Sequence, residues 1–312
     1  MTQPHAALLD TLRAQLNGVV LGKEDVIEQL LVGVLAGGHV LLEDVPGVGK
    51  TTLAKALAIT LGLDFSRVQF TPDLLPGDIV GSQVLDPKEG SFRFLRGPVF
   101  TEVLLADEIN RASPRTQSAL LEAMSEGQVT VEGTTWPLSQ PFFVLATQNP
   151  VDFQGTYPLP EAQLDRFLLR LTLGYPSHAE TLKMLYAHQH SHPLDGLQPV
   201  TDRDGVLALQ AAVREVHVEK EVGDYLLRLV EGTRRHAKVD LGLSPRGALA
   251  CFRAAQACAF LQGRSYVSPA DLQALAVPTM AHRLMLAPEA RYGGTSPADI
   301  IDEVVAATDV PG

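Results

Sequence analysis

The sequence predicts an α/β fold, in which a doubly wound, five-stranded parallel sheet is followed by a smaller, all-helical domain. Strand-like runs lie at 40–43, 65–70, 103–106, 142–147 and 167–173. The runs at 103–106 and 142–147 are continuously apolar, as parallel strands covered on both faces are. Helical patterns separate the strands. After Gly174-Tyr175-Pro176 only helical patterns remain, so we predict domains at 1–176 and 177–312.

Two helices are expected near the start of the sheet. Apolar residues recur at helical spacing from Val26 to Leu35, and Gly37-Gly38 ends that pattern. A second helix is predicted at 50–61, ending at Gly62.

Two insertions in the first domain are typical of β-hairpins. Residues 79–97 contain the turn Asp86-Pro87-Lys88-Glu89-Gly90, and residues 128–138 alternate around Glu132-Gly133. Trp136 in the second hairpin can be a substrate-contacting aromatic residue or the anchor of the hairpin, and the sequence does not choose between them.

Helix starts in the second domain carry recognisable caps. Ser177 and Glu180 form a capping-box pattern. Three later helices are predicted to begin at Ser-Pro pairs, with Ser as N-cap and Pro in the first turn. The pairs are Ser244-Pro245, Ser268-Pro269 and Ser296-Pro297.

Composition narrows the class of protein. The 312 residues are 46% hydrophobic and carry a net charge of −11, without a basic half that would suit nucleic acid. We expect no membrane-spanning run and no signal peptide. Cys251 and Cys258 lie seven apart in a predicted helix, too far to bridge. A reduced, cytoplasmic protein is the simplest interpretation.

The segment 40–52 reads VLLEDVPGVGKTT, an apolar run followed by a glycine-containing turn and a helical pattern. Such a loop binds phosphate because unpaired N–H groups and the positive helix end converge on the anion. We expect Lys50 at the β- and γ-phosphates and the Thr51 hydroxyl on Mg²⁺. A chance Gly-Lys-Thr in an ordinary turn is the alternative. The candidate binding residues of this loop are Pro46, Gly47, Val48, Gly49, Lys50, Thr51 and Thr52.

One position departs from the general phosphate-loop pattern. That pattern has Gly where this chain has Asp44. Asp tolerates unusual backbone angles better than most residues, so the turn can survive, but an acid beside a triphosphate is unexpected.

Two further strand ends carry polar groups. The run at 103–106 ends in Asp107 and Glu108, to which we assign Mg²⁺ binding and the polarisation of water, respectively. Asn149 follows the next strand and can contact the γ-phosphate or orient the water. Solvated acids and a plain Asn-Pro turn are the alternatives. Polar groups at successive strand ends are typical of a ligand crevice.

Few arginines are placed to reach a phosphate. Arg166 precedes the last predicted strand, and Arg246 lies at the start of a helix in the second domain. A guanidinium suits a γ-phosphate, although a lone arginine is usually in a surface ion pair. Arg111 and Arg115, just past the acid pair, are further candidates.

Four segments, taken in chain order, resemble motifs of the AAA+ ATPases. These segments are Asp44–Thr51, Asp107–Arg111, Asn149 and Leu164–Phe167. The hairpin insertions and Leu243–Arg246 are similar to the MoxR branch. The resemblance implies ATP and Mg²⁺ as ligands, Lys50 and Thr51 as Walker A, and Asp107 and Glu108 as Walker B. It further implies Asn149 as sensor 1, Arg166 as an arginine finger and Arg246 as sensor 2. Adenine would pack on Val20, Leu21, Gly22 and Lys23.

The same resemblance implies a homo-oligomeric ring, expected to be a hexamer, with Arg166 reaching the nucleotide of a neighbouring subunit. It suggests remodelling or maturation of client proteins, insertion of a metal cofactor, and adaptors with von Willebrand factor A domains. The alternatives are an MCM-like nucleic-acid motor, a magnesium-chelatase-like subunit and a nucleotide switch with little turnover. His188, His190 and His192 invite a metal site, but a solvated helix end is the better interpretation.

Overall fold

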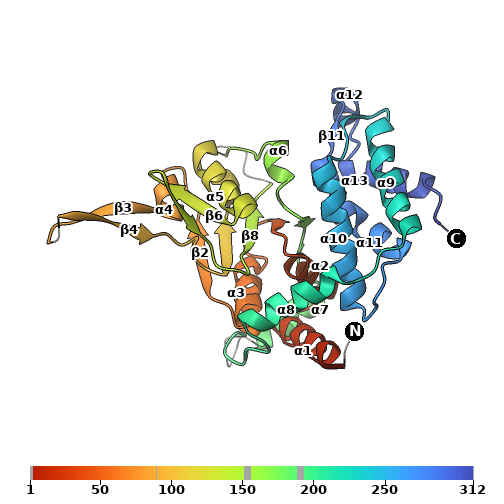
Figure 1. Cartoon of the computed structure of the whole chain (residues 1–312). Helices are drawn as coiled ribbons and strands as arrows, with labels where there is room; N and C mark the ends of the chain where they lie inside the picture. The colour runs from red at the N-terminus through yellow and green to blue at the C-terminus, as the bar shows by residue number, and fades with distance from the viewer. Residues whose placement is uncertain (1–2, 89, 151–155, 188–192, 312) are drawn as a thin grey trace.

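The computed structural model describes residues 3–88, 90–150, 156–187 and 193–311, and contains the predicted five-stranded sheet (Figure 1). Its strand order is β2-β5-β8-β1-β9, and every neighbouring pair is parallel. The α/β prediction is therefore confirmed. The strands are β1 (Val40–Glu43), β2 (Phe65–Gln69), β5 (Val103–Asp107), β8 (Phe143–Gln148) and β9 (Leu169–Leu171).

Alternating strand residues pack into two apolar layers, one on each face of the sheet. Leu41 and Leu104 contact the layer that contains α5 (Pro114–Glu126), near the short α4 (Pro76–Val80). Val40 and Leu105 lie in the opposite layer. That layer contains the helices α1 (Gln3–Val19), α2 (Glu24–Leu35) and α3 (Lys50–Leu61). Because successive side chains of a strand point to opposite faces, both faces are buried.

Both predicted hairpins form. The first pairs β3 (Gly81–Asp86) with β4 (Ser91–Arg96) and projects from the body of the domain (Figure 1). The second pairs β6 (Gln128–Val131) with β7 (Thr134–Pro137). Phe94 stacks on Trp136, with 4.6 Å between ring centroids and 16° between ring planes. This contact supports the anchor interpretation of Trp136.

In the described residues of the second domain, two short strands accompany the helices, which corrects the all-helical prediction. Strand β10 (Val239–Leu241) pairs with β11 (Met285–Leu286) in antiparallel fashion. Strands of three and two residues are too short for alternation to be visible in the sequence. The helices are α7 (His178–Ala187), α8 (Arg203–Arg214), α9 (Lys220–Arg235), α10 (Pro245–Leu261), α11 (Pro269–Met280), α12 (Pro288–Tyr292) and α13 (Pro297–Ala307).

The predicted Ser-Pro starts are confirmed at three of these helices. Ser244, Ser268 and Ser296 are the N-caps of α10, α11 and α13, and each is followed by Pro at the first position. Asp271 and Asp299 complete capping boxes at the latter two. Cys251 and Cys258 are buried and unbridged, as expected.

The N-terminal helices connect the two predicted domains. Arg13 of α1 donates to the Leu261 carbonyl at 2.6 Å, and Gln210 of α8 donates to the Val34 carbonyl at 2.7 Å. One apolar cluster runs from the sheet face into α8–α11. The boundary at residue 176 stays a prediction. In the described ranges, every helix is too short or too polar to span a membrane.

Candidate functional site

The loop after β1 has the backbone that a phosphate-binding turn requires. Gly47 and Gly49 have φ angles of 87° and 94°, which residues with a side chain rarely adopt. A Cβ atom at either position would meet nothing within 4 Å, so backbone conformation, and not space, demands glycine there. Gly49 precedes α3 and provides no side-chain cap. The first amides of α3 therefore point toward the loop without a side-chain partner.

Lys50 is buried at the centre of this loop. Its Nζ donates to the carbonyl oxygens of Asp44 at 2.7 Å and Val45 at 3.2 Å. Burial lowers the pKa of the Lys50 ammonium, while nearby carboxylates, Asp44 foremost, act in the opposite direction. The ammonium group is therefore held inside the loop by neutral carbonyl groups, which an anion can replace as its partner.

Asp44, the departure from the phosphate-loop pattern, has a structural role. Its φ angle is not positive, so glycine is not needed at this position. The buried carboxylate accepts from Val45 N at 2.9 Å and from Gly174 N at 2.6 Å. The Asp44 carboxylate thus connects the start of the loop to the segment after β9.

Thr147 connects the two acids at the end of β5. Its Oγ1 donates to Asp107 Oδ1 at 2.6 Å and accepts from Glu108 N at 2.8 Å. On the other side of Asp107, Arg67 of β2 donates to Oδ2 at 2.7 Å. The sequence analysis missed both partners. Arg67 and Thr147 lie on the two strands that flank β5, an arrangement that the structure shows.

Glu108 has a left-handed backbone, with φ 56° and ψ 50°. Such a conformation costs roughly 1–3 kcal/mol and is found most often at functional sites. Its Oε2 accepts from Gln69 Nε2 at 3.1 Å and from Arg111 Nη1 at 2.9 Å. The carboxylate is therefore held by an amide and a guanidinium. Arg111, a phosphate candidate in the sequence, contacts this acid.

The structure brings the predicted strand ends together. Asn149 follows β8 and is buried, and its carbonyl accepts from Asn110 Nδ2 at 3.3 Å. Strands β1, β8 and β5 are adjacent and parallel, so Asp44, Asn149 and Asp107 all lie at the carboxyl edge of the sheet. This juxtaposition at one edge of the sheet agrees with the sequence pattern, which is typical of a ligand site.

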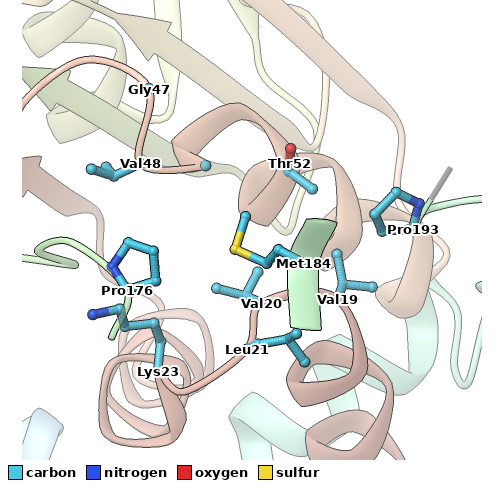
Figure 2. Close-up of a pocket in the computed structure, with 11 residues that line it drawn as sticks. Val19, Val20, Leu21, Lys23, Gly47, Val48, Thr52, Pro176, Met184 and Pro193 are labelled. Carbon is cyan, nitrogen blue, oxygen red and sulfur yellow. The ribbon is translucent and has the colours of Figure 1, made fainter. Parts of the chain in front are cut away.

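An apolar pocket lies beside the loop, where adenine was expected (Figure 2). Its wall combines the segment at the end of α1, the phosphate loop, and residues on both sides of the predicted domain boundary at 176. Lys23 Nζ donates to the Tyr175 carbonyl at 3.0 Å and joins the first and last of these segments. Such a wall suits a flat heterocycle. The lining residues are Val19, Val20, Leu21, Lys23, Gly47, Val48, Gly49, Thr52, Pro176, Met184 and Pro193.

Arg166 and Arg246 lie elsewhere. Both line a cavity with His39, which directly precedes β1, and with Ser125 at the end of α5. Arg246 Nη2 contacts Ser125 Oγ at 3.4 Å. This cavity is at the amino edge of the sheet. Strand β1 separates the two edges by ~13 Å, at ~3.3 Å per residue. The structure therefore brings the two arginines together, but not to the phosphate loop of their own chain.

The residues present fit a magnesium nucleotide. Asp107 already binds a cationic group, the Arg67 guanidinium, and Thr51 lies in the first turn of α3 beside the loop. Within the described part of the chain, no group of three or more His, Cys, Asp or Glu residues could hold a metal by itself. His188, His190 and His192 lie outside the described residues.

Comparison with known families agrees with this geometry. Residues 39–169 match the ATPase family associated with various cellular activities (AAA), and residues 231–304 match the AAA lid domain. The first match spans the phosphate loop and four strands of the sheet, and it ends at the first residue of the fifth strand, β9. The second covers part of the second domain, including Arg246.

Individual relatives cover nearly the whole chain. A Bacillus subtilis protein, YeaC, is 51% identical over 95% of this chain and 92% of its own. The chaperone MoxR1 of Mycobacterium tuberculosis is 39% identical over 94% and 80%, respectively. MoxR of Paracoccus denitrificans is 35% identical over 98% and 97%. The crystal structure of a candidate ATPase from Cytophaga hutchinsonii is 37% identical, with a TM-score of 0.91 over 99% and 96% of the two chains. The chain therefore belongs to the MoxR-like AAA+ ATPases.

Proposed function

We propose that this chain forms a ring, hydrolyses ATP between neighbouring subunits, and uses the cycle to remodel partner proteins or assist their maturation. One observation carries the proposal: the phosphate loop and its acids lie at one edge of the sheet, while two arginines suited to phosphate lie at the other. A catalytic site that needs both edges requires two copies of the chain.

ATP binding is assigned to the carboxyl edge. The amides around Gly47 and Gly49 and the Lys50 ammonium would hold the β- and γ-phosphates. Adenine would occupy the apolar pocket against Val20 and Leu21. These groups have the apolar body and the convergent polar donors that a nucleotide needs.

Hydrolysis is assigned to Glu108 and Asn149. Water attacks the γ-phosphorus, the bond to the bridging oxygen breaks, and Glu108 takes the proton that the water loses. Thr51 and Asp107 would hold Mg²⁺, which neutralises phosphate charge when bound. Gln69 and Arg111 both donate to Glu108 Oε2, so their hydrogen bonds hold the carboxylate at the end of β5.

Arg166 and Arg246 are assigned to the nucleotide of the neighbouring subunit. A guanidinium supplied in trans stabilises the charge of the transition state and contributes a factor of ~10³–10⁵ in other phosphoryl-transfer enzymes. The sequence left open whose nucleotide Arg246 senses. Its position beside Arg166 favours the neighbour's.

The binding of partner proteins is assigned to the two β-hairpins. The β3–β4 hairpin projects from the domain and exposes the large apolar residues Leu85, Phe92 and Leu95 (Figure 1). A relative at 39% identity is named a chaperone, which supports a protein client. A hexamer, von Willebrand factor A adaptors, metal-cofactor insertion and a cytoplasmic location belong to the same proposal.

The test combines assembly and turnover. We expect Lys50→Ala to abolish ATP binding, and Glu108→Gln to bind ATP, accumulate as a ring in analytical ultracentrifugation and turn over at least ~100-fold more slowly. Lys55→Ala, an exposed lysine in the same helix, is the matched control and should behave as wild type. A wild-type protein that hydrolyses ATP at an undiminished specific rate while monomeric would contradict the proposal.

A further inference from the structure

We propose that Asp165, Ser244 and Arg283 form a polar cluster that positions Arg166 and Arg246 together on one face of the subunit. Arg283 is then a positioning residue for hydrolysis in the neighbouring subunit, although it would not touch ATP. This inference rests on the proposed function, since it assumes that the two arginines act in trans.

One carboxylate joins three segments that are far apart in the sequence. Asp165 Oδ1 accepts from Arg283 Nε at 2.8 Å, and its Oδ2 accepts from Ser244 Oγ at 3.1 Å. Asp165 is bonded directly to Arg166. Ser244 lies two residues before Arg246. The hydrogen bond between Ser244 and Asp165 therefore joins two residues that lie within two positions of Arg246 and Arg166, respectively.

Arg283 is a buried residue of the second domain that holds the Asp165 carboxylate in place. Its side chain is only 2% exposed. Besides Asp165, its Nη2 donates to the Phe167 carbonyl at 2.6 Å and its Nη1 to the Leu168 carbonyl at 3.3 Å. A third carbonyl, that of Thr279 in α11, is also a partner. The planar guanidinium thus holds the backbone on both sides of Arg166 against the second domain.

Ser244 transmits the same constraint to α10. Its Oγ accepts from Gly247 N at 3.0 Å while it donates to Asp165. One hydroxyl therefore caps the helix and fixes the direction from which Arg246 leaves it. Because the cap and the bridge share an atom, the first turn of α10 cannot shift without changing the hydrogen bonds of Asp165.

Stability alone does not explain such a cluster. Desolvation of a buried ion pair often cancels the Coulomb attraction, so apolar residues of similar size can be as stable. A planar guanidinium, by contrast, fixes geometry through several directed hydrogen bonds. Catalytic groups are sensitive to geometry: a misplacement of about 1 Å can cost ~100-fold in rate.

The experiment is a subunit-mixing assay with Asp165→Asn. Alone, this variant should bind ATP with an affinity within about twofold of wild type and turn over roughly 100-fold more slowly. Glu108→Gln alone is also inactive. When the two are mixed, some interfaces pair an intact phosphate loop with intact arginines, because the contact is head-to-tail. Turnover should therefore recover to roughly a quarter of wild type for random equal mixing.

Matched controls separate positioning from folding. Asp271→Asn breaks a similar buried pair, Arg264–Asp271, at the start of α11, and should lower the melting temperature without lowering turnover. Ser244→Thr keeps the hydroxyl and should remain active, whereas Ser244→Ala should behave like Asp165→Asn.

The outcomes distinguish this inference from the proposed function. If Arg166→Ala mixed with Glu108→Gln recovers turnover and Asp165→Asn does not, arginines act in trans but the cluster does not position them. If neither mixture recovers, catalysis in trans itself fails. Asp165→Asn with wild-type turnover would overturn the inference outright.

Discussion

The two edges of the sheet differ in how complete they are. At the carboxyl edge, Lys50 is hydrogen-bonded within the phosphate loop, and Thr147 links Asp107 to Glu108. At the amino edge, Arg166 and Arg246 line a cavity in which nothing resembles a phosphate-binding loop. One edge has the loop and the acids, whose carboxylates are already paired with Arg67 and Arg111, and the other has Arg166 and Arg246 without a loop. Under the proposed function, a single subunit therefore holds two unlike half-sites, which suits head-to-tail assembly.

The same strand connects the two edges. His39 lies directly before β1, and Asp44 lies directly after it. His39 accepts from Val144 N through Nδ1, at 3.1 Å, and its Nε2 lies 3.1 Å from the Met124 carbonyl. The Asp44 carboxylate accepts a hydrogen bond from Gly174 N. Each edge of the sheet therefore has a buried residue that is hydrogen-bonded to a neighbouring segment, and each of these two residues can be substituted separately.

The largest effect should follow loss of the arginines. Arg166→Ala and Arg246→Ala together should lower turnover by ~10³ or more and leave the affinity for a fluorescent ATP analogue within about threefold. Arg235→Ala, which breaks an exposed ion pair with Glu231, is the control. A double variant that loses nucleotide affinity as strongly as Lys50→Ala would mean that the two edges are not separate half-sites.

The second-largest effect should be a loss of stability in acid, caused by His39 at the amino edge of the sheet. Burial lowers the pKa of His39 from 6.5 to about 4, with a smaller lowering from Arg246. The folded state binds fewer protons than the unfolded state between these values. The free energy of unfolding should therefore fall as the pH drops from 6.5 to 4, by up to about 3 kcal/mol from this residue.

His39→Asn tests this effect, because the Asn amide can accept from Val144 N but does not titrate. Urea denaturation between pH 7 and 4 should show a shallower decline for the variant. Some decline remains, since burial also lowers the pKa of His282. Identical slopes would exclude His39 as a source of the acid sensitivity.

At the carboxyl edge, Asp44→Gly restores the general loop pattern but should be harmful. It removes the acceptors of Val45 N and Gly174 N, at a cost of about 2 kcal/mol in unfolding free energy, and should weaken nucleotide binding several-fold. Thermal denaturation and nucleotide titration measure the two effects. Asp44→Asn, which keeps one acceptor, should lie between the variant and wild type. Tighter binding by Asp44→Gly would refute the anchoring role.

The smallest expected effect concerns Thr147. Thr147→Val keeps the shape but leaves Glu108 N and Asp107 without the hydroxyl, so turnover should fall about tenfold, equivalent to ~1.4 kcal/mol. Thr147→Ser should retain most activity. Steady-state ATPase assays compare the two. Equal loss in both variants would indicate a packing role for the Thr147 methyl group and not a role for its hydroxyl.

The sheet, the hairpins, the capped helices and the polar residues at the carboxyl edge could all be predicted from the sequence. Each leaves a local signal, such as a periodic apolar run, a Ser-Pro start or a glycine before Lys50, because short-range geometry sets it. Other features depend on contacts between distant parts of the chain: the role of Asp44, the partners Thr147 and Arg67, the two short strands and the placement of Arg246 beside Arg166. Asp44 meets Gly174 across 130 positions, and Asp165 meets Arg283 across 118. Contacts of this range have no sequence period, since chain folding alone brings such residues together.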